Sequence, residues 1–432
     1  MEKAEILSIL SDWNFWKKDR DAGIARESLV DRISRAAKTG EIIAVTGIRR
    51  SGKSTVLLQY CKKMMASGTR KENILIVNFE DPRFKKFDLD LLNQIYEIYL
   101  TELSPDEKHY VILDEVQLID GWEKFARFLH ENKKVNVFVT GSSSKLLSSE
   151  YSTVLSGRHI DIRVKPLSFR EFLRFQGVSI ASNLDISEKR HTIKREFDKY
   201  LKWGGFPKPT LVNEESEKTE ILGTYFRDIV VKDIVMRYSV KDISKIEDLA
   251  KYYLTNISTL QSFNRIKNFM KLNLDTVERY SGYLSQAYLV SFVRKFSYSK
   301  KEQIVNPRKV YCQDNGIRNA VSFVFSKDLG RLAENIVFNR LESKNFEVYY
   351  WSNLSECDFI VKEKDIVKGV IQVCWNMENG ETKDREIGGL LEACESFNLK
   401  SGLVLTEDYS SSEKVNGIKI TYIPIWRWLL EE

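Results

Sequence analysis

The sequence has no apolar run that approaches the ~20 residues needed to cross a membrane. Its first residues, Met1 to Glu5, also lack the basic region and apolar core of a secretory signal. The five cysteines are widely spaced, without the Cys-x-x-Cys pair that would suggest a zinc or redox centre. We therefore expect a cytoplasmic protein with reduced thiols and no membrane segment.

The length indicates several domains. With 432 residues, the chain exceeds the ~250–300 residues at which a single hydrophobic core usually stops growing. Its content of 43% apolar and 30% charged residues is typical of a soluble globular protein. Changes in pattern predict four parts: a first domain over 1–180, a helical lid or connector over 181–240, a small helical domain over 241–310 and an α/β domain over 311–432.

The strongest local pattern is a phosphate-binding loop. The apolar run 42–45 predicts a buried strand, and the glycines that follow allow a tight turn into a helix beginning near Lys53. Backbone N–H groups at such a helix start bind anions, Lys53 can reach the β- and γ-phosphates, and the Ser54 hydroxyl can bind Mg²⁺. The residues expected at the nucleotide are Gly47, Arg50, Ser51, Gly52, Lys53, Ser54 and Thr55.

An acidic pair about sixty residues later has the form of a Walker B motif. The apolar residues 110–113 precede Asp114 and Glu115. At the end of a buried strand, Asp114 can hold Mg²⁺ through its water shell, and Glu115 can polarise the attacking water. Together with the loop, this pair predicts nucleotide hydrolysis.

A sensor for the γ-phosphate is expected after the next strand, 135–140, which ends in a Gly-Ser-Ser-Ser run at 141–144. Thr140 or Ser142 can take this role. The run also fits a simple turn followed by a helix cap, and the sequence leaves both interpretations open.

Arg158 is the candidate for an arginine that stabilises charge in the transition state. It would act either on its own nucleotide or on that of a neighbouring subunit. Arg49, Arg50 and Arg163 compete for this role.

The alternation of apolar strands and helical segments predicts an α/β fold. In such a fold a parallel sheet is covered by helices on both faces, and ligands bind at the carboxyl ends of the strands.

These patterns resemble predicted AAA-type ATPases of archaea and bacteria, which carry a carboxyl-terminal domain of unknown function with a restriction-endonuclease-like core. The matching residues are 47–54, Leu113-Asp114-Glu115-Val116-Gln117, Thr140-Gly141-Ser142-Ser143, Ser156-Gly157-Arg158, Pro166-Leu167-Ser168-Phe169 and Gly204-Gly205-Phe206-Pro207. The resemblance implies a P-loop NTPase sheet, ATP as ligand, a cytoplasmic setting and a homo-oligomer. The Gly-Gly-Phe-Pro turn has no mechanical explanation in the sequence.

The third part combines short helices with basic residues. Helices are predicted over 246–257, 261–270 and 275–289, a strand over 290–296 and a wing over 297–301. Between Ser262 and Lys309 there are ten Lys/Arg and three Asp/Glu, an excess of +7 against +6 for the whole chain.

This order is typical of a winged helix that binds double-stranded DNA. The expected phosphate contacts are Arg265, Lys267, Lys271, Arg279, Arg294, Lys295, Lys300 and Lys301. The alternative is a lid or protein-contact module whose basic face is solvated.

The order of elements in the tail resembles the PD-(D/E)XK nuclease core, in which a helical Glu, a strand Asp and a Glu-x-Lys pair bind Mg²⁺ and activate water. Glu334 and Asp358 match the first two positions, whereas Gln372 and Cys374 stand at the third motif. Glutamine is uncharged, and a neutral thiol cannot replace the ammonium group of lysine. We therefore expect a degenerate site in a domain retained for binding or assembly.

The sequence thus predicts a Mg²⁺-dependent AAA-type ATPase whose ATP cycle alters how the later domains hold DNA or a protein partner. One alternative is a nucleotide-gated DNA-binding regulator with little turnover, which the intact acidic pair disfavours. The other is an ATP-dependent nuclease of a defence or mobile-element system, which the altered third motif disfavours.

Overall fold

The computed structural model describes the chain except residues 145–156, 323–328, 378–379 and 432. It divides into two compact units, Met1–Val164 and Lys165–Glu432. Among the described helices, none is long and apolar enough to span a membrane.

The first unit is built on a parallel sheet. Within the described residues this sheet has five strands in the order β2-β3-β4-β1-β5. The strands are β1 (Ile42–Thr46), β2 (Ile74–Asn78), β3 (His109–Asp114), β4 (Val135–Gly141) and β5 (His159–Arg163). The helical elements are α1 (Lys3–Trp13), α2 (Glu27–Ala37), α3 (Lys53–Ala66), η1 (Lys71–Asn73), α4 (Leu89–Leu103), η2 (Val116–Leu118) and α5 (Trp122–Glu131). The predicted α/β fold is confirmed.

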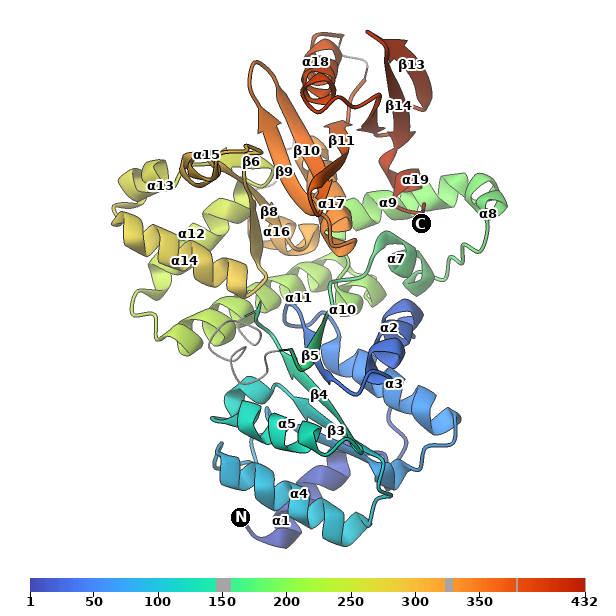
Figure 1. The fold of residues 1–432 in the computed structure, drawn as a ribbon, viewed down its shortest axis with the longest axis vertical. Helices are drawn as coiled ribbons and strands as arrows, with labels where there is room; N and C mark the ends of the chain where they lie inside the picture. Colours follow the sequence, from blue (N-terminus) through green and yellow to red (C-terminus); the bar gives the residue numbers. More distant parts are fainter. Residues whose placement is uncertain (145–156, 323–328, 378–379, 432) are drawn as a thin grey trace. The chain divides into compact units, whose positions relative to one another are not determined.

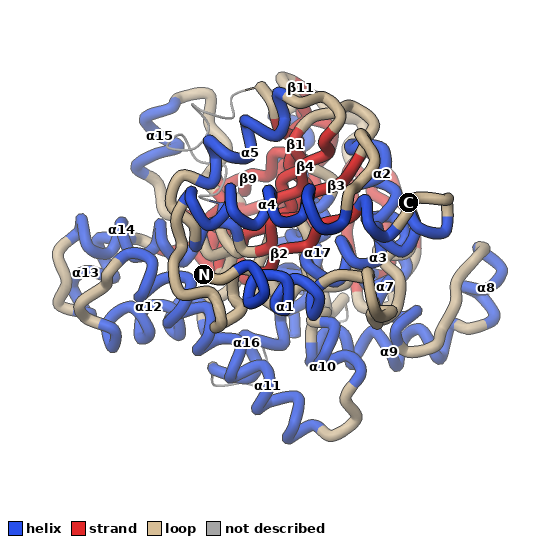
Figure 2. Tube along the Cα trace, turned by 90° about the horizontal axis from the view of Figure 1, so that it is seen from below, coloured by secondary structure: helices blue, strands red, loops and turns tan. Residues whose placement is uncertain are grey.

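Helices cover both faces of this sheet (Figure 1), and strand β1 shows why. Ile42 and Ala44 belong to a core shared with α1, α4 and α5, whereas Ile43 and Val45 belong to a second core with α2 and α3. Successive side chains of a strand point to opposite faces, so a strand that is apolar throughout is buried on both. Figure 2 shows β2, β3, β4 and β1 side by side in that order. Their carboxyl ends meet at one edge, where the phosphate loop lies.

The second unit begins with a run of helices. These are α7 (Phe169–Phe175), α8 (Asn183–Glu188), α9 (Arg190–Trp203), α10 (Pro207–Leu211), α11 (Glu215–Asp228) and the π-helical segment η4 (Ile229–Met236). The predicted helical character of 181–240 is confirmed.

Three helices and a small antiparallel sheet follow. The elements are α12 (Ile243–Thr255), β6 (Thr259–Gln261), α13 (Phe263–Met270), α14 (Leu274–Gln286), β7 (Val290–Val293), α15 (Lys300–Val305) and β8 (Arg308–Cys312), with strand order β6-β8-β7. The three predicted helices are present. The segment expected to form a wing instead leads into α15, because the Ser299 side chain accepts the Glu302 N–H and starts a helix.

The rest of the second unit is a mixed sheet with helices. The elements are α16 (Asn315–Val321), α17 (Leu329–Ser343), β9 (Glu347–Ser352), β10 (Glu356–Glu363), β11 (Ile366–Cys374), α18 (Gly380–Ser396), β12 (Ser401–Thr406), β13 (Ser411–Val415), β14 (Ile418–Pro424) and α19 (Ile425–Trp428). Among the described residues six strands pair in the order β13-β14-β12-β11-β10-β9. β9, β10 and β11 are antiparallel, whereas β12 is parallel to β11 and to β14.

The Gly-Gly-Phe-Pro turn now has a structural explanation. Gly204 follows α9 with φ of 69°, and a Cβ there would lie 2.2 Å from Oδ1 of Asp314. A Cβ on Gly205 would lie 2.4 Å from the carbonyl oxygen of Leu167, and the Leu167 N–H donates to the Gly205 carbonyl at 2.7 Å. Both positions require glycine because neighbouring atoms occupy the space of a side chain.

Asp314 holds this turn in place. Its buried carboxylate accepts the Gly205 N–H at 2.7 Å and caps α16 through the N–H groups of Gly316 at 2.8 Å and Ile317 at 3.2 Å. One carboxylate therefore connects the end of α9 to the start of α16, across more than a hundred residues of sequence.

We predict that Gly205→Ala destabilises the protein by about 2–3 kcal/mol, because the new Cβ meets backbone atoms that cannot move independently. Gly223→Ala is the matched control: it lies inside α11 with nothing within 4 Å of the added carbon. The control should be neutral or stabilising, since alanine favours helix. Scanning calorimetry of both variants would show this, and equal melting midpoints for the two would contradict the role assigned to the turn.

Candidate functional site

The loop after β1 is held open by glycines. Gly47 has φ of 142° and Gly52, which precedes α3, has φ of 98°. A Cβ on Gly47 would lie 2.1 Å from the carbonyl oxygen of Val164, so this position excludes any side chain. Arg50 also has a positive φ, 66°. The loop therefore follows the course predicted from the sequence, from the end of β1 to the first turn of α3.

Lys53 points back over the loop. Its Nζ donates to the Gly47 carbonyl at 3.2 Å and lies 3.5 Å from Oε1 of Glu115. Both charged side chains are buried, at 4% and 8% exposure. In this arrangement the ammonium and carboxylate groups neutralise each other where phosphates are expected.

Asp114 stands at the carboxyl end of β3, beside the start of α3. Its Oδ1 accepts hydrogen bonds from the Ser54 hydroxyl at 2.9 Å and from the Thr140 hydroxyl at 2.6 Å. Burial, and next the repulsion from Glu115, raises the pKa of Asp114 to about 6. A carboxylate next to a serine hydroxyl offers the oxygen donors that Mg²⁺ prefers, and such a cation would favour the ionised carboxylate.

Glu115 has an uncommon backbone conformation that turns the chain away from β3. Its φ is 55°, a region that non-glycine residues rarely occupy outside turns and functional sites. Its N–H donates to the Thr140 hydroxyl at 2.8 Å, and its Oε2 accepts from Nε2 of Gln117 at 2.6 Å. Thr140 on β4 therefore holds both acidic residues, and Gln117 also holds the carboxylate of Glu115.

The structure clarifies the predicted sensor. Thr140 is fully buried, and its hydroxyl both donates to Asp114 and accepts from Glu115. This geometry makes Thr140 a residue that positions the acidic pair. Ser142 is also fully buried. The alternative of a helix cap after 141–144 involves residues outside the described part of the chain.

The predicted arginines lie at different ends of the sheet. The Arg158 carbonyl accepts the Ile42 N–H at 2.9 Å, at the amino end of β1, about 16 Å along the strand from the loop. Arg163 pairs with Thr46 at the carboxyl end, beside the loop. Arg49 donates to Glu80 at 2.6 Å. The structure therefore does not bring Arg158 to the phosphate loop of its own chain. An action of Arg158 on a neighbouring subunit stays a prediction. Ser156, which belongs to the same sequence motif, lies outside the described residues.

Sequence reasoning missed two arginines of the amino-terminal segment. Arg26 is buried, and its Nη1 donates to the Ser51 carbonyl within the loop at 3.0 Å. Arg20 lines a cavity of about 30 Å³ together with Ser54 and Asp114. Burial lowers the pKa of Arg20, while attraction by Asp114 opposes that shift. No local pattern marks these residues, because only the tertiary fold brings them to the loop.

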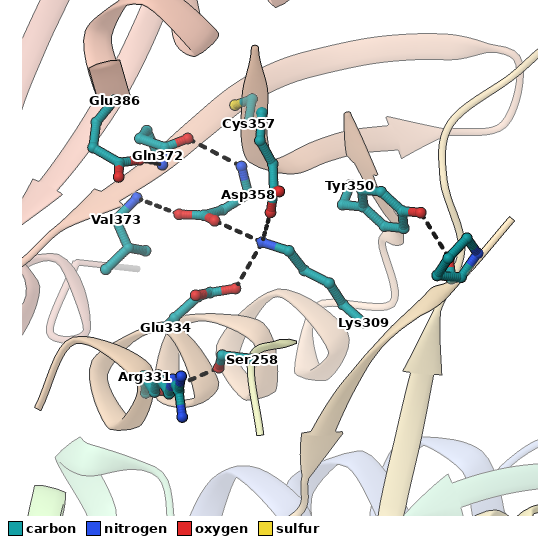
Figure 3. A network of polar contacts seen from close by, with 12 residues as sticks. Ser258, Lys309, Arg331, Glu334, Tyr350, Cys357, Asp358, Gln372, Val373 and Glu386 are labelled. Carbon is teal, nitrogen blue, oxygen red and sulfur yellow. Dashed lines mark hydrogen bonds and ion pairs between the residues drawn. The ribbon is translucent and has the colours of Figure 1, made fainter. Parts of the chain in front are cut away.

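The tail brings three of its four predicted residues together. Glu334 on α17 and Asp358 on β10 both contact the ammonium group of Lys309 on β8 (Figure 3). Gln372 lies beside them, since its Oε1 accepts the Asp358 N–H at 3.0 Å and its Nε2 donates to Glu386.

Cys374 belongs to the hydrophobic core with Ile360 and Leu390, two residues beyond Gln372 on β11. Burial raises the pKa of its thiol to about 11. Within the described residues, no group of three or more His, Cys, Asp or Glu side chains is arranged to hold a metal ion.

The predicted DNA contacts are mostly at the surface. Arg265, Lys271, Arg279, Arg294, Lys300 and Lys301 are exposed, and Lys267 and Lys295 are half-buried. Lys309, which contributed to the basic excess of this segment, is buried and paired with acids. The basic surface is therefore smaller than the sequence indicated.

Two family models match parts of the chain. Residues 39–173 match the model of an AAA domain, and residues 194–328 match a domain of unknown function (DUF8612). The AAA part of the sequence resemblance is thereby confirmed. The restriction-endonuclease-like tail stays a proposal.

Two solved structures show weak likeness. A Walker-type ATPase of Pyrococcus abyssi superposes with a TM-score of 0.44 at 12% identity, over 70% of this chain and 99% of that one. AMPPCP-bound DnaA from Aquifex aeolicus gives 0.28 at 13% identity, over 60% and 86%. The fold assignment therefore rests on the strand order and the AAA match.

Curated relatives cover almost the whole chain. An uncharacterized protein of Haemophilus influenzae is 28% identical over 412 residues, which are 94% of this chain and 98% of the relative. An uncharacterized protein of Methanocaldococcus jannaschii is 33% identical over 409 residues, which are 90% of this chain and 88% of the relative. The chain therefore belongs to the same family as this archaeal protein, and its residues 39–173 match an AAA domain.

Proposed function

We propose that the protein is a Mg²⁺-dependent ATPase of the AAA type. One observation carries this proposal: Lys53, Ser54, Asp114 and Glu115 meet at the carboxyl edge of a parallel sheet, around a loop that begins with a glycine tolerating no side chain. This arrangement of cation, hydroxyl and two carboxylates is what phosphoryl transfer to water requires.

Each residue has a distinct role in the proposed reaction. The backbone N–H groups of the loop and of the first turn of α3, up to and including that of Thr55, bind phosphate oxygens. The ammonium group of Lys53 binds the β- and γ-phosphates. Ser54 and Asp114 would hold Mg²⁺, and this ion would neutralise negative charge on the phosphates. Glu115 orients and polarises the attacking water.

The contact between Lys53 and Glu115 gives the site a resting arrangement. When Lys53 turns to the phosphates, Glu115 loses its counter-charge, and its carboxylate becomes available to accept a proton from water. Gln117 and Thr140 keep this carboxylate and its backbone in place while the lysine moves. Nucleotide binding would therefore activate the base of the reaction.

We predict that Glu115→Gln lowers kcat for ATP hydrolysis by at least about 100-fold while ATP still binds, because the amide cannot accept a proton from water. Glu107→Gln is the matched control, since Glu107 is 79% exposed and pairs with a surface lysine. Steady-state phosphate release and equilibrium binding of ATP would be measured for both. Unchanged turnover in Glu115→Gln would remove Glu115 from the mechanism.

A second prediction concerns Thr140. Thr140→Val keeps the shape of the side chain but removes the hydroxyl that contacts Asp114 and Glu115. We expect kcat to fall by about 10–100-fold and the Mg²⁺ requirement to rise, whereas Thr140→Ser retains most activity. Titrations of activity against Mg²⁺ for the two variants distinguish these outcomes. Equal activity of the valine and serine variants would contradict the positioning role.

We further propose that ATP hydrolysis is coupled to DNA binding by residues 243–312. The order α12, β6, α13, α14, β7, α15 and β8 supports a winged helix with α14 as the third helix, in which α15 stands between the two wing strands. Exposed basic side chains on α13, α14 and after β7 support a polyanion as partner. A lid or protein-contact role remains the alternative that the experiment below tests.

We predict that the protein binds double-stranded DNA with an affinity that falls steeply with salt. Arg279→Gln, on the exposed side of α14, should reduce the slope of log affinity against log salt by about 1. Lys251→Gln on α12 is the control, because Lys251 already pairs with Glu247. Fluorescence anisotropy at several salt concentrations gives both slopes. Absence of binding at low salt would favour the lid.

The tail follows the order of elements expected from the resemblance. We propose a restriction-endonuclease-like fold for α17, β9, β10, β11, α18 and β12, supported by three antiparallel strands followed by a parallel fourth. The test is a solved structure of the chain, in which a different order of strands would contradict this assignment. No nuclease activity is proposed, for the reason developed next.

A further inference from the structure

Lys309 comes from β8 and enters the acidic cluster of the tail. Its Nζ lies 2.7 Å from Oε1 of Glu356, 2.8 Å from Oδ1 of Asp358 and 3.2 Å from Oε1 of Glu334 (Figure 3). The lysine side chain is only 3% exposed. An ammonium group has three N–H donors, and here each has a carboxylate within reach.

The carboxylates are themselves held in place. The Tyr311 hydroxyl donates to Oε1 of Glu334 at 2.7 Å, and the Val373 N–H donates to Oδ2 of Asp358 at 3.0 Å. The backbone N–H of Asp358 donates to Gln372. Glu334 and Asp358 therefore face Lys309 in orientations fixed by α17, β8, β10 and β11.

The charge balance favours a bound cation. Burial opposes the charge on Lys309, but attraction by Asp358 and Glu334 raises its pKa well above the ordinary value. Burial, with repulsion from Asp358, raises the pKa of Glu334, whereas Lys309 and the Tyr311 hydroxyl oppose this shift. Glu386 accepts from Nε2 of Gln372 and is itself paired with Arg385. The cluster therefore needs a positive charge, and Lys309 supplies it.

We propose that the ammonium group of Lys309 is the resident cation of the cluster formed by Glu334, Glu356 and Asp358, in the place where a divalent metal ion would have to bind. A metal ion could bind at this place only by displacing the ammonium group of Lys309. The displaced ammonium group would then be buried without a carboxylate to balance its charge. Metal-dependent hydrolysis of a phosphodiester by this cluster would require the ammonium group of Lys309 to leave its centre.

The ion pairs of Lys309 also connect the three-stranded sheet, through β8, to the mixed sheet, through β10. Lys309 is separated from Glu334 by 25 residues and from Asp358 by 49 residues. Two neighbouring hydrogen bonds also connect the segment around β8 to the elements that follow it. The Cys312 N–H donates to Asn335 on α17, and the Tyr350 hydroxyl on β9 donates to the Pro307 carbonyl. Replacement of Lys309 should therefore lower the free energy of unfolding of the second unit.

Lys309→Met tests the proposal through stability. We expect the melting midpoint to fall by about 10 °C, because buried carboxylates lose their counter-ion. Asp358→Asn in the Lys309→Met background should recover part of this loss, since one uncompensated charge disappears. Lys251→Met, whose ion pair is exposed, should shift the midpoint by about 1–2 °C. A Lys309→Met midpoint equal to that of Lys251→Met would overturn the proposal.

A measurement on the folded natural chain covers the case in which Lys309→Met does not fold. Mn²⁺ binding is followed by electron paramagnetic resonance in the absence of nucleotide, for the natural chain and for Asp358→Asn. We expect the same number of bound Mn²⁺ ions in both, because Lys309 already fills the cluster. One additional Mn²⁺ in the natural chain that is lost in Asp358→Asn would show that a metal, and not Lys309, is the cation.

Discussion

The candidate site depends on one interaction, the pair of hydrogen bonds that Oδ1 of Asp114 accepts from Ser54 and Thr140. These bonds bring β3, α3 and β4 together at the edge where the phosphate loop begins. The strand order places β4 between β3 and β1, so Thr140 stands between the acidic pair and the loop. Burial, and next the repulsion from Glu115, raises the pKa of this carboxylate to about 6. Magnesium binding would therefore complete an arrangement that the protein already holds in place.

Much of the first unit could be predicted from the sequence, because its signals are local. Apolar runs marked the strands, and the spacing of Gly47, Gly52, Lys53 and Ser54 marked the turn into α3. The roles of Thr140 and Gln117 could not be predicted in this way. Their contacts depend on which strands are neighbours and on the direction that Glu115 takes with a positive φ.

The second unit shows how burial changes the meaning of a residue. In the sequence Lys309 counted toward a basic surface, yet it is the internal counter-ion of acids far along the chain. Cys374 stood at the place of a missing lysine, yet it packs in a hydrophobic core. The Gly-Gly-Phe-Pro turn gained its explanation only when Asp314 and Leu167 were found against its glycines. Such partners leave no periodic pattern, so tertiary structure alone identifies them.

In the proposed reaction the protein cleaves the nucleotide that it binds, and Glu115 polarises the water that attacks the γ-phosphate. The most direct test is the chemical identity of the nucleotide that remains with the protein after incubation with labelled ATP and Mg²⁺ and rapid removal of the free nucleotide. The account predicts ADP on the natural chain, ATP on Glu115→Gln and little nucleotide on Lys53→Ala. Intact ATP on the natural chain, at the same level as on Glu115→Gln, would contradict it and leave the nucleotide as a static ligand.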